Sequence, residues 1–236
     1  MSNYNSYLTN HLSSQINSNS RVNKKNWIIH NYKKFIPKNK DANILDIGPG
    51  YGELVELFGI DEGYVNICAI DLSNEVVDYC NNIIPNSTIL VENTEKFLFS
   101  KSNKFDVIFM LQVLEHIPKD AVTNLLLAIR ESLSPNGVAI IEVPNISNNI
   151  IGVDLFCSDF SHQVAYTETT LRYVLNTADF SSIEVYELKV PLVSFGRLVQ
   201  YVLQKILSYF MISLKKIYYP SRRHCVSPVI YAVVSK

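Results

Sequence analysis

The chain has 236 residues, a formal net charge of -1 and 47% hydrophobic residues. This composition excludes a disordered chain, and the near-zero charge gives no general electrostatic attraction to nucleic acid. The four cysteines lie far apart and form no Cys-x-x-Cys pair, which argues against a zinc site and a disulfide framework. We therefore expect a single α/β domain in a reducing cytoplasm.

Residues 1–40 are expected to form an N-terminal arm and a helix. Residues 1–20 are rich in Asn and Ser and lack the apolar segment of a signal peptide, so a flexible arm is predicted. Apolar residues recur at helical spacing between Asn23 and Phe35. This spacing predicts a helix that ends near Pro37.

Three glycines alternate directly after the apolar run 44–47, at Gly48, Gly50 and Gly52. A strand that ends in glycines and restarts as a helix lets a ligand lie against backbone N–H groups. The dinucleotide-binding fingerprint places its third glycine five positions after the first, where this chain has Glu53. A carboxylate would repel a pyrophosphate, so the pattern favours a nucleoside ligand without phosphates.

Asp71 ends the next apolar run, Val65 to Ile70. An acidic residue at the tip of the second strand is placed to accept both ribose hydroxyls of an adenosine. A plainer interpretation makes Asp71 a cap of the following helix. The two roles are compatible.

Strand and helix patterns alternate from residue 43 onwards, which predicts a parallel sheet with helices on both faces. The expected strands are 43–47, 65–70, 88–91, 105–110, 137–143, 182–190 and 228–235. The expected helices are 52–58, 73–82, 119–133 and 167–177, with Thr167 as N-cap of the last. A core of 43–190, a helical insertion of 193–226 and a last strand of 228–235 make up the predicted domain.

The insertion contains a long amphipathic stretch, 197–219, with apolar residues on one face and lysines mostly off it. Lys205 near its middle argues against a membrane span. Three interpretations remain open: a lid over the site, a homodimer interface, or a helix lying on the membrane surface. Arg222 and Arg223 follow it and are candidates to bind an anionic acceptor or lipid phosphates, with a solvated basic turn as the plain alternative.

Several motifs in order resemble those of class I S-adenosylmethionine-dependent methyltransferases. Asp46-x-Gly-x-Gly-x-Gly matches the first motif of that family, and Asp71 matches its ribose-binding acid. Val91–Glu95 aligns with a segment that usually reads Gly-Asp-Ala-Glu. Phe105–Ile108 and Leu114-Glu115-His116-Ile117-Pro118 match its fourth strand and the loop after it, and Ser134–Val138 matches the turn into the fifth. The resemblance covers about 43–180 and the final strand. It implies a Rossmann-like, seven-stranded, mostly parallel sheet with an antiparallel last strand.

The resemblance also implies that the cofactor is S-adenosylmethionine, with S-adenosylhomocysteine as product. The backbone at Gly48, Gly50 and Gly52 is then expected to face the methionine part and the ribose. Asp46 would order the glycine loop or hold the methionine amine. In the family, the segment before the first strand often folds over the cofactor, which makes Tyr4 and Tyr7 candidates for that role.

The remaining cofactor contacts come from the ends of later strands. Asp71 is expected to bind the ribose hydroxyls, and Leu72 to stack under adenine. Asn93 occupies the place of an Asp that meets the adenine amino group, and Asn can still accept through its carbonyl oxygen. Thr94 would contribute its N–H, and Gln112 marks the tip of the fourth strand, where the family backbone contacts the methionine part.

Two histidines are candidate bases for the acceptor. His162 lies in a loop expected over the carboxyl edge of the sheet, and imidazole titrates near neutral pH, which suits it to accept a hydroxyl proton. His116 belongs to the Leu-Glu-His motif, and in this family branch the histidine of that motif often lines the active-site floor. Its role there is either packing and hydrogen bonding or catalysis. Further acceptor-site candidates are Asn145, Tyr166, Asp159 and Glu142, the last of which has the alternative of a solvent-facing charge. No metal-binding constellation is expected.

The His162 loop, the helix ending in Ala-Asp-Phe and the hydrophobic basic tail resemble methyltransferases of capsule and lipopolysaccharide gene clusters. This implies O-methylation of a bacterial surface polysaccharide, a sugar precursor or a substituent such as phosphoramidate. Asp179 stands where that family has Gly, and Asp tolerates a left-handed backbone. Alternatives are a small-molecule (quinone or lipid) methyltransferase and a non-catalytic cofactor-binding homologue. The expected location is the cytoplasm, at the inner membrane face if 197–219 binds lipid.

Overall fold

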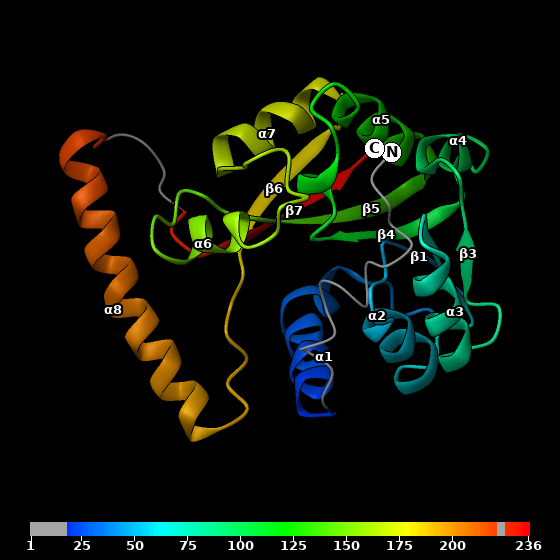
Figure 1. Cartoon of the computed structure of the whole chain (residues 1–236), viewed down its shortest axis with the longest axis horizontal. Helices are drawn as coiled ribbons and strands as arrows, with labels where there is room; N and C mark the ends of the chain where they lie inside the picture. Colours follow the sequence, from blue (N-terminus) through cyan, green and yellow to red (C-terminus); the bar gives the residue numbers. More distant parts are fainter. Residues whose placement is uncertain (1–17, 221–224) are drawn as a thin grey trace.

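The computed structural model describes residues 18–220 and 225–236. Its centre is a seven-stranded sheet in the order β3-β2-β1-β4-β5-β7-β6 (Figure 1). The strands are β1 (Asn43–Ile47), β2 (Asn66–Asp71), β3 (Thr88–Leu90), β4 (Phe105–Leu111), β5 (Leu133–Pro144), β6 (Ser182–Glu187) and β7 (Val229–Ser235). Strands β1 to β5 pair in parallel, and β7 runs antiparallel to both β5 and β6. The expected mostly parallel sheet with an antiparallel last strand is confirmed.

Helices pack on both faces of this sheet. They are α1 (Ser18–Tyr32), α2 (Glu53–Glu56), α3 (Asn74–Ile83), α4 (Thr94–Phe99), α5 (Val122–Ser132), α6 (Ile151–Cys157), α7 (Glu168–Thr177) and α8 (Phe195–Tyr218). Short 3-10 turns η4 (Lys33–Phe35) and η6 (Leu114–His116) and a π-turn η5 (Leu57–Asp61) complete the set. Helix α1 starts five residues earlier than the predicted 23–35 and ends three earlier, with η4 continuing to Phe35.

Two large buried clusters form most of the core, one on each sheet face, and a small third cluster joins Tyr51 to α3. Alternate residues of a strand point to opposite faces, so Leu45 and Ile108 belong to one cluster and Ile44 and Val107 to the other. The first cluster is closed by α5 and α7, and the second by α1, α2 and η5. Burial of this apolar surface is the main stabilising term of the sheet.

The strand order reverses between the neighbouring strands β1 and β4. On one side the sheet continues from β1 through β2 to β3, and on the other it continues from β4 through β5 and β7 to β6. In an open α/β sheet, this reversal creates a crevice at the carboxyl ends of the strands. The loops that leave β1 and β4 carry Gly48 and Gln112, so both lie at this edge.

Several elements differ further from the sequence-based prediction. Helices α4 and α6 were not predicted, because each is too short to show a periodic apolar face. Strand β5 starts at Leu133 instead of 137, and its pairing with β4 shifts register between Phe105 and Val107. Strand β6 ends at Glu187 instead of 190.

Helix α8 lies along the outside of the molecule (Figure 1). Near its start, Arg197 donates to Asn23 Oδ1 of α1 at 3.2 Å, and near its end Lys215 donates to the carbonyl of Ser147. Met211 is its buried residue, whereas Leu203, Ile206 and most of its other large apolar side chains are exposed. Within residues 18–220 and 225–236, none of the helices has the length and hydrophobicity needed to traverse a bilayer.

Candidate functional site

The glycine loop leaves β1 in a left-handed backbone conformation. Gly48, Gly50 and Gly52 have φ of 73°, 54° and 69°, values that residues other than glycine rarely adopt. A Cβ on Gly48 would lie 2.6 Å from Val113 Cγ2, whereas a Cβ on Gly50 would meet no atom of the described residues within 4 Å. Among the described residues, the backbone at Gly50 is therefore open in the direction of its Cβ.

Helix α1 holds this loop from outside. Arg21 donates to the carbonyl of Tyr51 at 3.0 Å, and Lys24 pairs with the buried Glu53 at 3.1 Å. Arg21 also pairs with Glu56 in α2. The loop is thus fixed between α1 and α2 before any ligand binds.

Two carboxylates beside the loop are buried against their preference for water. Burial raises the pKa of Asp46 to about 7; Lys24 opposes this, and the negative charges of Glu53 and Asp71 add to it. Burial likewise raises the pKa of Asp71 to about 6, against hydrogen bonds from the backbone of Ser73 and Leu72. A cationic ligand at this position would favour the ionised forms of both.

Asp71 combines the two roles considered for it at the tip of β2. Its Oδ1 accepts the N–H of Ser73 at 2.8 Å and so orders the turn into α3. A carboxylate has about four acceptor positions, which leaves capacity for ribose hydroxyls. The neighbouring Leu72 is 39% exposed, so an apolar surface is available beside it for a flat ring.

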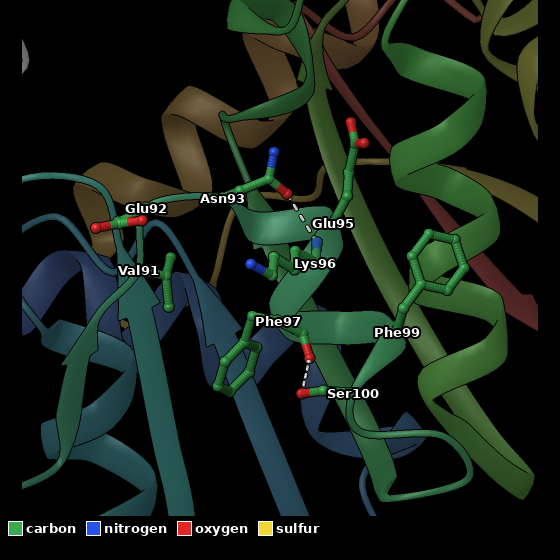
Figure 2. A pocket seen from close by; sticks show the side chains of 8 residues that line it. All are labelled: Val91, Glu92, Asn93, Glu95, Lys96, Phe97, Phe99 and Ser100. Atoms are coloured by element: carbon green, nitrogen blue, oxygen red, sulfur yellow. Dashed lines mark hydrogen bonds between the residues drawn. The ribbon is translucent and has the colours of Figure 1, made fainter.

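Asn93 caps α4, which changes the role expected for it. Its Oδ1 accepts the N–H of Lys96 at 2.7 Å, and its amide nitrogen points away from the helix (Figure 2). The oxygen expected to meet the adenine amino group thus already serves as the N-cap of α4, with one further acceptor position, and the group turned outward is a donor. Thr94 follows as the first residue of α4.

The surrounding segment, residues 91–100, lines a shallow open pocket (Figure 2). Asn93 is the sole member of the predicted site in its lining. The glycine loop and the two histidines do not contribute to it, so we do not place the reaction there.

Gln112 anchors the tip of β4 in a strained conformation. Its φ is 57°, and its Nε2 donates to Glu142 Oε1 at 3.0 Å. Tyr32 of α1 donates to the other oxygen of Glu142. Burial raises the pKa of Glu142, and the two hydrogen bonds oppose that shift. Glu142 is therefore an internal link between α1, β4 and β5, and its interpretation as a solvent-facing charge is wrong.

The predicted histidines lie together next to Glu115. The rings of His116 and His162 meet edge to face with centroids 4.5 Å apart, and His162 Nε2 lies 3.9 Å from Glu115 Oε1. Two backbone bonds hold the loop in this place: the N–H groups of Gln163 and Val164 donate to the carbonyl of Glu115 at 2.7 and 3.1 Å.

Both rings are oriented by further hydrogen bonds. His162 Nδ1 bonds the carbonyl of Phe156 at 2.7 Å. His116 Nδ1 bonds Ser161 Oγ at 2.9 Å, and Ser161 Oγ donates to Asp159 Oδ1 at 2.6 Å. Hydrogen bonds from Ser161 help to hold the pKa of Asp159 below its usual value, against desolvation. Asp159 is thus an orienting residue for the histidine pair.

Glu115 is the site residue that sequence reasoning missed. Its side chain is fully buried, neither carboxylate oxygen has a hydrogen-bond partner among the described residues, and burial raises its pKa to about 8. Glu115, His116 and His162 each offer one ligand atom within 4.8 Å of the others. The structure thus assembles a constellation of metal-ligand type that the sequence analysis did not expect. The adjacency of Glu115 to His116 was the available clue.

Two acceptor-site candidates are buried in the core. Asn145 is fully buried, and its Nδ2 donates to the carbonyls of Cys225 and Ser227 at 3.3 and 2.8 Å. It holds the segment before β7, so its expected role in acceptor binding is corrected to a structural one. Tyr166 pairs with Asn145 in an isolated β-bridge, and burial raises the pKa of its hydroxyl. That hydroxyl has no hydrogen-bond partner in residues 18–220 and 225–236.

The other candidates lie outside the described residues: Tyr4, Tyr7, Arg222 and Arg223.

Comparison with known proteins places this site in context. The sequence profile described as "Methyltransferase domain" matches residues 21–185. A solved S-adenosylmethionine-dependent methyltransferase from Archaeoglobus fulgidus is 17% identical with a TM-score of 0.64, over 90% of this chain and 94% of that chain. No curated protein matches the chain.

Two further solved structures are similar in fold. Phosphoethanolamine N-methyltransferase 2 from Haemonchus contortus, in complex with phosphomonomethylethanolamine and S-adenosylhomocysteine, is 14% identical with a TM-score of 0.62, over 100% of this chain and 61% of that chain. A methyltransferase from Thermotoga maritima, described as a possible histamine N-methyltransferase, is 11% identical with a TM-score of 0.63, over 92% and 90%. At these identities the likeness concerns the fold.

Proposed function

The chain belongs to the family of methyltransferase domains and uses S-adenosylmethionine; from this premise we propose that it methylates an oxygen of a bacterial surface polysaccharide, of its sugar precursor or of a substituent such as phosphoramidate. The resemblance to methyltransferases of surface-glycan gene clusters suggested this acceptor class. The observation that supports methylation of an oxygen is the orientation of the His162 imidazole by its hydrogen bond to the carbonyl of Phe156.

The residues at the carboxyl edge suit the cofactor in shape and charge. The open backbone at Gly50 would face the methionine part and ribose, and Asp46 would hold the methionine amine. Asp71 would bind the ribose hydroxyls beside Leu72, and the outward amide of Asn93 would donate to an adenine ring nitrogen. When bound, the cofactor supplies an electrophilic methyl group on a sulfonium.

His162 is suited to receive the acceptor's proton. Because Nδ1 donates to the carbonyl of Phe156, Nε2 carries the lone pair on the side of Glu115. In the proposed reaction, a hydroxyl O–H would give its proton to His162 Nε2, and the bound cofactor would supply the methyl group to that oxygen and leave as a neutral thioether. His116 packs against the His162 ring and limits its rotation.

The experiment compares surface polysaccharide from cells with and without the gene by mass spectrometry and NMR. Loss of a methyl ether from a sugar supports the proposal, and loss of a methyl from a phosphorus-bearing substituent supports its phosphoramidate form. An unchanged polysaccharide overturns the glycan assignment and favours a small-molecule acceptor.

Complementation with His162→Ala tests the base. We expect loss of transfer to a sugar hydroxyl by about 10²-fold or more, since a general base contributes on that order. His30→Ala, on the exposed part of α1, is the matched control and should restore methylation fully. Turnover by His162→Ala close to wild type would contradict the role of His162.

We also propose that α8 rests on an anionic membrane surface at the cytoplasmic side. Its charged residues are Arg197, Lys205, Lys215 and Lys216, and it contains no acidic residue. Its exposed apolar residues include Leu203, Ile206 and Phe210. A helix of this kind binds lipid through its apolar face, with basic side chains at the head groups. Because its contacts to Asn23 and Ser147 flank the carboxyl edge, such docking would bring the site close to the membrane.

A further inference from the structure

Three potential metal ligands converge where the η6 turn meets the loop between α6 and α7. Glu115 and His116 are neighbours in η6, and His162 comes from the loop. One ligand atom of each lies within 4.8 Å of the other two. We propose that Glu115, His116 and His162 bind a divalent transition-metal cation, a site that extends the proposed function by giving the acceptor oxygen a cationic partner.

Glu115 supplies the strongest argument. Its side chain is completely buried, and neither of its carboxylate oxygens has a hydrogen-bond partner in the described part of the chain. An isolated buried carboxylate is costly, and proteins normally pair such a group or use it to coordinate a metal. No Lys or Arg pairs with it there, whereas the two imidazoles stand beside it.

The outer contacts of the histidines match those of metal-binding imidazoles. Ligating histidines usually hydrogen-bond through the second ring nitrogen to a carbonyl, carboxylate or similar group, which fixes the ring. His162 Nδ1 bonds the carbonyl of Phe156 at 2.7 Å, so Nε2 faces Glu115. His116 Nδ1 bonds Ser161 Oγ at 2.9 Å, which in turn donates to Asp159.

The ligand set defines the class of ion. Two imidazoles and one carboxylate are typical of zinc and of non-haem iron and similar transition metals, whereas magnesium and calcium prefer oxygen ligands. Bonds of about 2.0–2.2 Å allow ligand atoms on one ion to lie at most roughly 4.4 Å apart. The distance of 3.9 Å between His162 Nε2 and Glu115 Oε1 lies within this limit.

Such an ion would retain coordination positions beyond its three protein ligands. A hydroxyl or phosphate-type oxygen bound there is polarised and loses a proton more readily. The same cluster would then activate an oxygen acceptor by coordination, and the hydroxyl proton would pass to solvent. In this form His162 is a ligand and replaces the base role considered above. Direct measurement of metal binding distinguishes the two roles, because only a ligand role makes bound metal depend on His162.

The test measures binding without cofactor or acceptor. The full chain is treated with a chelator, dialysed against Zn²⁺ or Co²⁺, and analysed for bound metal by mass spectrometry. We expect about one ion per chain and, for Co²⁺, visible absorption bands that report nitrogen coordination. His162→Ala and Glu115→Gln should each weaken binding by tenfold or more.

Two matched controls keep the result interpretable. His30→Ala and Glu92→Gln change exposed residues of the same types and should bind metal like the wild type. Thermal unfolding establishes that each variant is folded, and His162→Ala carries the test if Glu115→Gln does not fold. Absence of stoichiometric binding by the wild type, or equal binding by His162→Ala, overturns the proposal. Because no methyl transfer is measured, failure of the glycan assignment does not affect this outcome.

Discussion

Gly48 is subject to two separate constraints that a single residue must satisfy together. Its φ of 73° favours glycine, and a Cβ would lie 2.6 Å from Val113 Cγ2. Gly50 has a similar φ of 54°, but the space beside it is open. Substitutions at Gly48 therefore combine backbone strain with steric overlap, whereas substitutions at Gly50 introduce backbone strain alone.

Replacing Gly48 with Ala should destabilise the folded protein by about 3 kcal/mol or more, the sum of strain and overpacking. Chemical denaturation of Gly48→Ala, Val113→Ala and the double variant measures the two parts. The double variant should recover on the order of 1 kcal/mol or more relative to additivity, because truncating Val113 removes the overlap but not the strain. Strict additivity would show that Val113 does not restrict this position.

The corresponding change at Gly50 should act mainly on the ligand. Gly50→Ala incurs strain of about 1–3 kcal/mol without a steric contact inside the protein. Its added methyl would lie in the open space beside the loop, so titration calorimetry with S-adenosylhomocysteine should show at least tenfold weaker binding. Unchanged affinity would mean that the cofactor does not approach Gly50 from this side.

Individual residues also mark what a sequence can predict. The expectation that Asp179 tolerates a left-handed turn is confirmed by its φ of 60°, because that preference is a local property of the residue. The burial of Glu142 could not be predicted, since its partners Tyr32 and Gln112 come from other elements. Glu115 had only its adjacency to His116 as a local signal, since its other neighbour, His162, comes from a distant loop.

At the level of elements, long periodic segments were predicted well, whereas the two short helices α4 and α6 were missed. Helix α7 and its Thr167 cap follow the prediction, because the Thr167 side chain accepts the N–H of Thr170. Helix α6 has seven residues and depends on Asn148, whose Oδ1 accepts the N–H groups of Ile150 and Ile151. Hydrogen bonds from one preceding side chain, without a periodic apolar face, give too little pattern to define a helix from sequence.

Helix α8 presents a face that the rest of the described chain does not cover. The combined variant Leu203→Ser, Ile206→Ser and Phe210→Ser removes three of its exposed apolar side chains. Co-sedimentation should show more than tenfold weaker binding to phosphatidylglycerol-containing vesicles, since each buried side chain contributes on the order of 1 kcal/mol or more. Binding to pure phosphatidylcholine vesicles should be weaker for the wild type, because the basic residues then lack a partner.

Gln204→Ser changes an exposed polar residue of the same helix and should leave vesicle binding intact. Light scattering after size exclusion distinguishes the alternative. If the wild type does not bind vesicles but forms a dimer, and the triple variant is monomeric, this face binds a second copy of the chain.

For the whole molecule, the alternation of strands and helices was enough to predict the sheet, and the last strand followed from the resemblance. The alternation of strands and helices also placed Gly48, Asp71 and Gln112 at one edge of the sheet, because parallel strands end on the same side. The contact of Glu115 with His162 depends on how the loop between α6 and α7 returns to η6, through the backbone bonds of Gln163 and Val164. Such a return has no periodicity in the sequence, so the cluster became visible only in three dimensions.

The buried acids at the carboxyl edge make stability of the ligand-free protein depend on pH. The pKa of Asp46 is about 7 in the folded chain against an ordinary value of 3.8, so between these values the folded state retains a proton that the unfolded state has released. Stability is then highest below about pH 4 with respect to this group and falls as pH rises, with the loss complete above about pH 7. A pKa difference of this size corresponds to at most roughly 4 kcal/mol.

Asp46→Asn removes this titration while preserving the shape of the side chain. Urea unfolding at pH values from 5 to 8 should show a clear decline for the wild type and a shallower one for Asp46→Asn, with the remainder due in part to Asp71, whose pKa is also raised. Asp120→Asn alters an exposed carboxylate and should keep the wild-type slope. If the free energy of unfolding of Asp46→Asn falls with pH as steeply as that of the wild type, ionisation of buried Asp46 is not the source of the pH dependence. In that case a cationic ligand gains little by pairing with it, and the proposed contact of Asp46 with the methionine amine loses its electrostatic basis.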